Sequence, residues 1–260
     1  MKYVIEKSNK RFWGQIGISL LLLALYGAGM PFGLLNISIG NEDMTFVLNM
    51  AFISVVTIIV FPTIFKGWEF GLHKRGIWRG ITKYGVGMLI GSVIIVADTY
   101  YGAMPFDKTP GAWSIVSQCI INFFFVGLVE EVLLRGCIFK ALLLKFGNNK
   151  KGVWLSILIS SAIFSLMHIV GAPDDRRIFL MKLLWTFFGG VAFSILYYTT
   201  NNLWCVVILH WMLDIAEFPT MFSGKDTYSV IANSALLSSI VTLIFTICFC
   251  RREMARLLNK

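Results

Sequence analysis

The sequence alternates between apolar blocks of about 20 residues and short polar loops. A helix of this length crosses the roughly 30 Å hydrocarbon core of a bilayer and satisfies its own backbone hydrogen bonds there. The composition agrees, because 57% of the residues are hydrophobic and 14% are charged. A soluble domain has about 45–50% apolar and about 25% charged residues. The pattern therefore predicts an all-α, polytopic transmembrane helical bundle.

About eight blocks are long enough to span a bilayer, and no polar stretch between them is long enough for a separate soluble domain. We therefore expect a single integral membrane domain over residues 1–260. The basic N-terminus also resembles a signal peptide with a cleavage site near residues 27–29, but we expect an uncleaved span because apolar character continues to Ile39. The expected spans lie at about residues 12–35, 45–65, 84–101, 113–144, 153–170, 178–198, 203–221 and 228–250.

Lys and Arg residues gather in alternate loops. One such loop, between the second and third expected spans, contains Lys66, Lys74, Arg75, Arg79 and Lys83. Basic loops remain on the cytoplasmic side of a membrane, so an even number of spans places both termini in the cytoplasm. The net charge of +9 is thus explained by orientation in a lipid bilayer, and we expect a multi-pass protein of the cell membrane with no nucleic-acid partner.

The same loop carries aromatic and aliphatic residues between its bases. Trp68, Phe70, Ile77 and Trp78 are interleaved with the Lys and Arg residues. This mixture is typical of an amphipathic segment that lies in the membrane interface. We expect such a segment here.

Two acidic residues and one basic residue stand inside the fourth apolar block, Glu130, Glu131 and Arg135. Charged groups at this depth cost several kcal/mol each unless they are paired or face a wet cavity. Glu131 and Arg135 share one helix face at i and i+4, which favours an ion pair. Glu130 points about 100° away and can face a cavity. A purely structural salt-bridge cluster is the alternative interpretation.

Two later blocks carry histidines. Phe164 and His168 share one helix face in the fifth block, and His210 and Asp214 share one in the seventh. Glu130 and His168 lie at equal offsets from the loop between their blocks, which places them at the same level of an antiparallel helix pair. An acid such as Asp214 can orient an imidazole and fix its tautomer. The pattern predicts that these groups meet inside the membrane.

Hydrolysis is the chemistry that this group of residues fits. Glu130 would activate a water molecule, one histidine would share the proton, and the other with Asp214 would stabilise the oxyanion. No Ser or Cys in these blocks has a histidine at helical spacing, so a covalent nucleophile is not favoured. Two His and one Glu are also familiar zinc ligands, and the residues alone leave that possibility open although H-E-x-x-H is absent.

Three short motifs follow one another along the chain: E-E-x-x-x-R at 130–135, F-x-x-x-H at 164–168 and H-x-x-x-D at 210–214. Together they resemble the ordered motifs of the CPBP family, which groups CAAX prenyl endopeptidases, bacterial Abi proteins and bacteriocin-processing or self-immunity proteins. The resemblance covers about residues 113–220, which we interpret as the motif-bearing catalytic core. The first three expected spans and the last carry no motif.

The resemblance implies a glutamate-type intramembrane protease that needs no bound metal or other cofactor. It implies that Glu130 is the catalytic base, that His168 helps to activate water, and that His210 with Asp214 forms the oxyanion site. The third family motif ends in Asn or Asp, and Asp214 fits the bacterial form. The candidate catalytic residues are therefore Glu130, Glu131, His168, His210 and Asp214, with Arg135 and Phe164 in support.

We expect an endopeptidase that cleaves a membrane-associated peptide or a membrane-anchored protein, lipidated or not, from the cytoplasmic side. The small size and the Asp form suggest a bacterial member that matures a peptide pheromone or bacteriocin, or that confers immunity. Two alternatives remain open. One is a non-enzymatic membrane regulator or immunity protein that binds a partner. The other is a proton-coupled carrier that uses Glu130 and the histidines as a relay.

Overall fold

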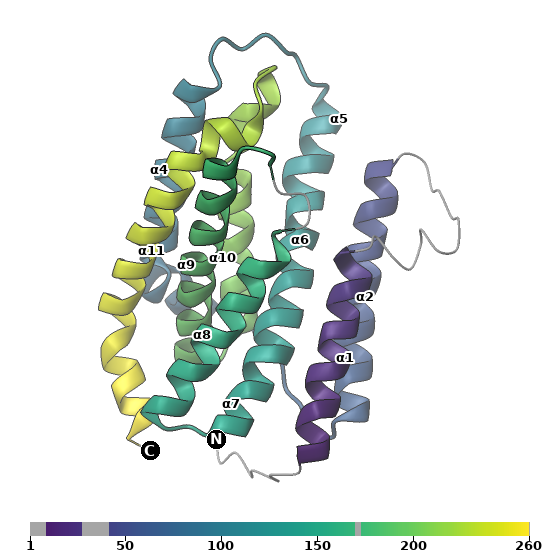
Figure 1. Ribbon diagram of the computed structural model, residues 1–260, viewed down its shortest axis with the longest axis vertical. Helices are drawn as coiled ribbons and strands as arrows, with labels where there is room; N and C mark the ends of the chain where they lie inside the picture. Colours follow the sequence, from purple (N-terminus) through teal and green to yellow (C-terminus); the bar gives the residue numbers. More distant parts are fainter. Residues whose placement is uncertain (1–8, 28–41, 170–172, 260) are drawn as a thin grey trace.

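The computed structural model describes residues 9–27, 42–169 and 173–259, and within these ranges the chain is helical and contains no strand. The long helices stand side by side in a bundle (Figure 1). The all-α prediction is confirmed. The long helices are α1 (Asn9–Gly27), α2 (Glu42–Ile64), α4 (Val86–Gly102), α8 (Lys150–Met167), α9 (Arg176–Thr200), α10 (Leu203–Ile215) and α11 (Thr227–Leu258). The short elements α3 (Ile77–Arg79) and η1 (Gly80–Tyr84) precede α4, and a 3₁₀ turn, η4 (Phe218–Phe222), follows α10.

The first motif lies in a continuous helical stretch of 35 residues, Ala112–Phe146. At about 1.5 Å per residue this stretch is about 50 Å long, so a hydrocarbon core of roughly 30 Å covers only part of it. Two of its segments are π-helical, and such wide turns occur frequently at functional sites. Its segments are α5 (Ala112–Ile115), η2 (Val116–Asn122), α6 (Phe123–Glu131), η3 (Val132–Phe139) and α7 (Lys140–Phe146), where η2 and η3 are the π-helical ones.

Within the described residues, six helical segments are long and apolar enough to cross a bilayer. A seventh qualifies if the bent pair Ile77–Tyr84 and Val86–Gly102, which turns by 65°, is one span. These seven follow the order of the second to eighth expected spans. Helix α1 occupies the start of the first expected span, whose remainder at residues 28–35 lies outside the described residues, as does most of the candidate cleavage site. The expected number of about eight spans is therefore approximate.

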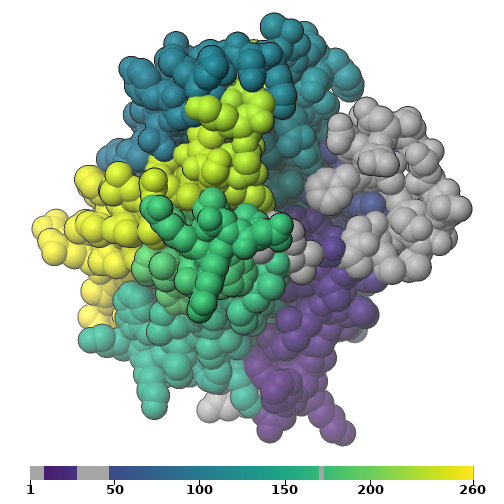
Figure 2. Space-filling view, turned by 45° about the horizontal axis from the view of Figure 1, so that its top comes forward, coloured from purple at the N-terminus to yellow at the C-terminus, as the bar shows by residue number. Residues whose placement is uncertain are grey.

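Helix packing brings the motif-bearing segments together. Helix α11 packs along α4 and α9, and α9 packs against α8. Helix α10 contacts α4, α6 and α9, so it lies inside the bundle (Figure 1). Helices α1 and α2 pack against the α6 and η3 segments, on the side that faces away from α10 (Figure 1). The space-filling view shows the start of α9, in green, at the surface beside α11, in yellow (Figure 2).

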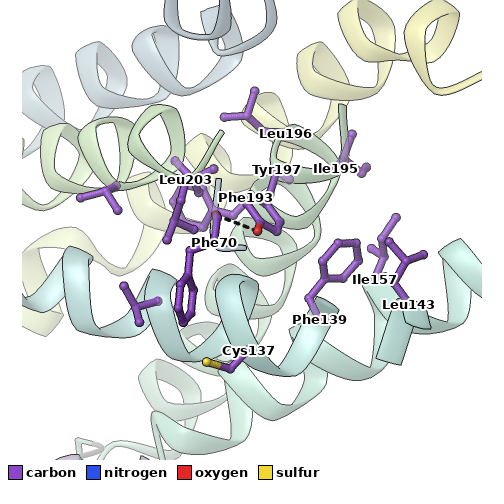
Figure 3. Close-up of a cluster of buried hydrophobic side chains, with 14 of the residues drawn as sticks. Phe70, Cys137, Phe139, Leu143, Ile157, Phe193, Ile195, Leu196, Tyr197 and Leu203 are labelled. Atoms are coloured by element: carbon purple, nitrogen blue, oxygen red, sulfur yellow. Dashed lines mark hydrogen bonds between the residues drawn. The ribbon is translucent and has the colours of Figure 1, made fainter. Parts of the chain in front are cut away.

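The connection between α2 and α3 folds into the protein. Trp68 and Phe70 are each only 5% exposed. The Trp68 indole donates a hydrogen bond to the carbonyl of Gly136 at 3.0 Å, and the Tyr197 hydroxyl donates to the carbonyl of Phe70 at 2.9 Å (Figure 3). The expected interfacial position is therefore wrong for these two aromatic residues. Both side chains are buried, and groups in the protein interior form hydrogen bonds with the Trp68 indole and with the Phe70 carbonyl. The expected position agrees with Trp78, which is 78% exposed.

A hydrophobic cluster fills the space between η3, α8, α9 and the start of α10 (Figure 3). Its members Phe139, Leu196 and Leu203 are at most 1% exposed. Phe193 belongs to the same cluster and stacks on the ring of His210, with 4.8 Å between the ring centroids. The cluster therefore packs directly against the third motif and excludes water from that side.

Candidate active site

The first motif supplies a buried ion pair at the junction of α6 and η3. The Glu131 and Arg135 side chains are 0% and 1% exposed, and Glu131 Oε1 lies 2.9 Å from Arg135 Nη1. Arg135 Nη2 also donates to the carbonyl of Gly190 at 3.2 Å. The guanidinium lies over the rings of Phe164 and Phe193, at 4.5 and 5.1 Å from their centroids. The predicted i, i+4 ion pair is confirmed, and the cation has further partners on α8 and α9.

Gly190 permits the close approach of α9 to α8 that brings Phe164 next to the Arg135 guanidinium. A Cβ atom at this position would lie 3.1 Å from atoms of both the Phe164 and Ser161 side chains. The missing side chain thus leaves room for Phe164 beneath the Arg135 guanidinium.

The third motif brings His210 onto the same acidic pair. His210 Nδ1 lies 2.8 Å from Glu131 Oε1, and because a carboxylate only accepts, the ring nitrogen is the donor. His210 Nε2 lies 3.8 Å from Glu130 Oε2 and 3.7 Å from Asp214 Oδ1, beyond direct hydrogen-bond distance. Asp214 was expected to orient this ring, whereas Glu131 makes that hydrogen bond. The i, i+4 spacing placed Asp214 on the correct face but could not show that an acid on a neighbouring helix is closer.

Only one of the two carboxylate oxygens of Glu130 has a hydrogen-bond partner among the described residues. Its residue is 6% exposed, and Oε1 accepts a hydrogen bond from the Tyr26 hydroxyl at 3.1 Å. Oε2 is buried and has no hydrogen-bond partner among the described residues. Glu130 and Glu131 therefore serve different partners, as their angular separation predicted. Tyr26 was not predicted, because α1 carries no motif that marks it.

His168 lies directly after the last residue of α8. Its Nδ1 is 2.8 Å from the carbonyl oxygen of Phe164, so Nδ1 is the donor and Nε2 of a neutral ring is an acceptor. The rings of His168 and Phe164 are 4.8 Å apart, and the Phe164 ring is 6.0 Å from that of His210. The predicted packing of Phe164 beside His168 is confirmed, and Phe164 contacts both imidazoles.

A cavity of about 220 Å³ lies among α4, α8, α9, α10 and α11. His168, His210 and Asp214 line it together. Glu130 is not among its lining residues and approaches it through His210. Further polar groups that line the cavity are Lys182, Thr186, Glu217, Tyr228, Ser238, Ser239 and Thr242.

Lys182 is a buried cation that the motifs did not predict. Its residue is 5% exposed. The ammonium group donates to the Tyr228 hydroxyl at 2.9 Å and lies 4.4 Å from the centroid of the Tyr228 ring. A single lysine inside the apolar block of α9 was the available signal, since such residues in a span usually mark function.

The part of the chain that the structure describes contains no group of three or more His, Cys, Asp or Glu side chains arranged to hold a metal ion. The five cysteines are free thiols, and Cys248 is the exposed one.

Comparison with protein families identifies the central part of the chain. Residues 112–216 match the family described as Rce1-like, type II CAAX prenyl endopeptidase. The match contains all three motifs and coincides closely with the core expected at about residues 113–220. Comparisons with curated proteins and with solved structures gave no match. The chain is a multi-pass membrane protein that carries, at residues 112–216, a domain of the type II CAAX prenyl endopeptidases, a family of intramembrane proteases and thus of hydrolases.

Proposed function

We propose that this protein is an intramembrane endopeptidase in which Glu130 activates the attacking water. The observation that supports this role most is the position of Glu130 Oε2, which is buried, has no hydrogen-bond partner among the described residues, and lies 3.8 Å from His210 Nε2. A water molecule at about 2.8 Å from each of these atoms fits this separation. Glu130 would take the proton of that water as it attacks the peptide carbonyl, and would then deliver it to the leaving amine.

The two histidines would act on the developing charges. Glu131 holds Nδ1 of His210, so Nε2 is directed to the reacting groups. As an imidazolium, His210 would donate from Nε2 to the oxyanion, with Asp214 at 3.7 Å to balance its charge. His168 lines the same cavity, and its Nε2 would accept a hydrogen bond from the attacking water.

The surroundings favour these electrostatic roles. Phe164 and Phe193 cover His210 at 6.0 and 4.8 Å between ring centroids. Together with the lipid they exclude bulk water, and charge interactions in a site of low dielectric are stronger than in water. The same low dielectric makes the orientation of each group costly to disturb.

The proposed substrate is a membrane-associated peptide or a membrane-anchored protein. The matched family is named for prenylated substrates, so a lipidated chain is one candidate and an unmodified peptide is another. The Asp form of the third motif and the small size favour a bacterial protein of the cell membrane. Its role would be the maturation of a peptide pheromone or bacteriocin, or self-immunity.

Comparative peptidomics tests the proposed function without knowledge of the substrate. Membranes that contain wild-type protein are compared with membranes that contain Glu130→Gln, which keeps the shape of the side chain and removes the base. Glu253→Gln is the matched control, because Glu253 makes a surface ion pair with Arg256 at the end of α11. We expect cleavage products that depend on Glu130 but not on Glu253. Identical peptide sets would contradict the proposal, and full biological activity of Glu130→Gln would then support a regulator.

A further inference from the structure

We infer that Tyr26 is a positioning residue of the proposed reaction, because its hydroxyl holds the Glu130 carboxyl group in the orientation that the attacking water requires. This role rests on the proposed function of Glu130 as the base. It adds a residue of α1, a helix that precedes the matched family domain at residues 112–216. The active site of this chain thus includes a helix outside that domain.

The Tyr26 hydroxyl and the Glu130 carboxyl group are joined by a hydrogen bond between α1 and α6. The hydroxyl lies 3.1 Å from Glu130 Oε1, and it is the donor because an ionised carboxylate only accepts. Oε2 of the same carboxyl group is buried, has no hydrogen-bond partner among the described residues, and lies 3.8 Å from His210 Nε2. One oxygen is therefore held by the protein, while the other faces the position proposed for the water.

The two neighbouring glutamates are held in different ways. Oε1 of Glu131 accepts hydrogen bonds from Arg135, one turn further along the chain, and from His210 on α10. Within the described part of the chain the Glu130 carboxyl group accepts one hydrogen bond, which Tyr26 donates. Loss of that bond would leave the terminal torsion of the Glu130 side chain without a polar restraint, and this torsion is intrinsically broad. The orientation of Glu130 therefore depends on α1.

Helix packing brings Tyr26 to this place. The buried residues of α1 lie at intervals of four along one face of the helix, and they are Gln15, Ser19 and Leu23. Tyr26 follows Leu23 by three positions, so it extends that face by one turn. Leu23 belongs to a hydrophobic cluster with Val129, and Tyr26 packs against the same cluster. These apolar contacts fix α1 at the level where the Tyr26 hydroxyl meets Glu130.

The position of a general base determines the rate of the step that it catalyses. A misplacement of about 1 Å can lower the rate about 100-fold, and general base catalysis as a whole contributes about 10²–10⁴-fold. Loss of the Tyr26 hydroxyl leaves the base in the site but orients it less well, so the effect should be smaller than that of removing the base. Tyr26 does not line the cavity that contains His168 and His210, so we expect kcat to change and KM to stay the same.

Two isosteric variants test this role in purified protein reconstituted in lipid, with a peptide substrate that peptidomics has identified. Tyr26→Phe removes the hydroxyl that donates to Glu130. Tyr198→Phe is the matched control, because it removes a hydroxyl that donates to Asn148 Oδ1 at 2.7 Å, in the connection between α7 and α8. We expect Tyr26→Phe to lower kcat about tenfold, with KM within twofold of the wild type and a similar melting temperature. Tyr198→Phe should keep the wild-type kcat.

Infrared spectroscopy supplies a measurement that needs no substrate and that a merely structural role would not change. The difference spectrum between the wild type and Glu130→Gln identifies the bands of the Glu130 carboxyl group. These bands should move in Tyr26→Phe, which removes the donor to Oε1, and should stay in place in Tyr198→Phe. Tyr26→Met also lacks the hydroxyl and should show the same shift and the same loss of kcat, so the result does not depend on a single variant.

A wild-type kcat in Tyr26→Phe would overturn the inference. A loss of kcat with unmoved Glu130 bands and a lower melting temperature would overturn it as well, because Tyr26 would then act only on stability. Glu130→Gln separates the two proposals. Loss of turnover in Glu130→Gln together with full turnover in Tyr26→Phe contradicts this inference alone, whereas full turnover by Glu130→Gln contradicts the proposed function.

Discussion

Glu131 Oε1 and His210 Nδ1 are joined by a hydrogen bond of 2.8 Å between α6 and α10. The same oxygen accepts from Arg135 Nη1 at 2.9 Å. One carboxylate oxygen thus connects the first and third motifs, and it fixes the ring of His210 from the side opposite to Glu130. In the proposed mechanism the second glutamate of the acidic pair positions His210, and Glu130 remains available for water.

This arrangement predicts that Glu131 matters more than Asp214 for the orientation of His210. We expect Glu131→Gln to lower kcat by about 100-fold, because the amide weakens the contact that selects the tautomer and leaves Arg135 without its counter-ion. Asp214→Asn should lower kcat by less than about tenfold, since Asp214 lies 3.7 Å from Nε2 and makes no direct hydrogen bond to it. Steady-state kinetics of the two isosteric variants provides the comparison. A larger loss for Asp214→Asn would contradict the assigned roles.

Arg135 is predicted to be essential for stability. Arg135→Met removes the counter-ion of a carboxylate that is 0% exposed, and an unpaired buried charge costs about 3–5 kcal/mol. We expect a corresponding decrease in the free energy of unfolding, measured by denaturant titration in detergent micelles. Arg256→Met is the control, because its ion pair with Glu253 lies at the surface with Arg256 63% exposed. That control should change stability by less than about 1 kcal/mol. Similar losses for the two variants would show that the buried pair is not a structural requirement.

The tight turn between α7 and α8 sets the level of the second motif relative to the first. A Cβ atom at Gly152 would lie 2.3 Å from the carbonyl oxygen of Gly147 and 2.5 Å from that of Phe146, so the backbone must move. We expect Gly152→Ala to lower the melting temperature and the activity together. Gly17→Ala in α1 is the matched change, because nothing lies within 4 Å of its Cβ position and Gly17 does not line the cavity. It should be neutral or stabilising by up to about 1 kcal/mol. If Gly152→Ala were as well tolerated, the hairpin would not be fixed at this point.

The expected orientation predicts which loops a membrane-impermeant thiol reagent reaches. Lys151→Cys, at the start of α8, should react only after the cell is permeabilised, because basic loops stay in the cytoplasm. Thr109→Cys, in the connection between α4 and α5, should react on intact cells. Both positions are exposed, and the exposed native thiol at Cys248 is first replaced by Ser. The opposite pattern of labelling would reverse the assigned topology.

The sequence predicts the helical class and the Glu131–Arg135 pair because both depend on local periodicity. It also predicts the helix face that carries His210 and the packing of Phe164 beside His168, although His168 lies directly after the end of α8 and not on its face. It does not predict the hydrogen bond from Tyr26 on α1 to Glu130. These two residues are 104 positions apart in the chain, and their contact depends on how the two helices pack. A lysine inside an apolar block marks Lys182 in the sequence, but its place in the cavity depends on how α9 packs against α11.

The loop with Trp68 and Phe70 shows a second limit of local patterns. Alternating basic and aromatic residues look alike whether the rings enter a membrane interface or the protein interior. The interior position follows from partners that are distant in sequence, the carbonyl of Gly136 and the hydroxyl of Tyr197. Only the assembled bundle supplies those partners.

The role of Glu130 as the base is the central claim, and the turnover of a purified variant tests it most directly. Wild-type protein, Glu130→Gln and the control Glu253→Gln are reconstituted in lipid and given one peptide substrate identified by peptidomics, with melting temperatures measured in parallel. We predict that Glu130→Gln lowers kcat by about 100-fold or more, as expected for loss of a general base, with a melting temperature close to that of the wild type and with Glu253→Gln fully active. Turnover by Glu130→Gln within a few-fold of the wild-type rate would contradict the account.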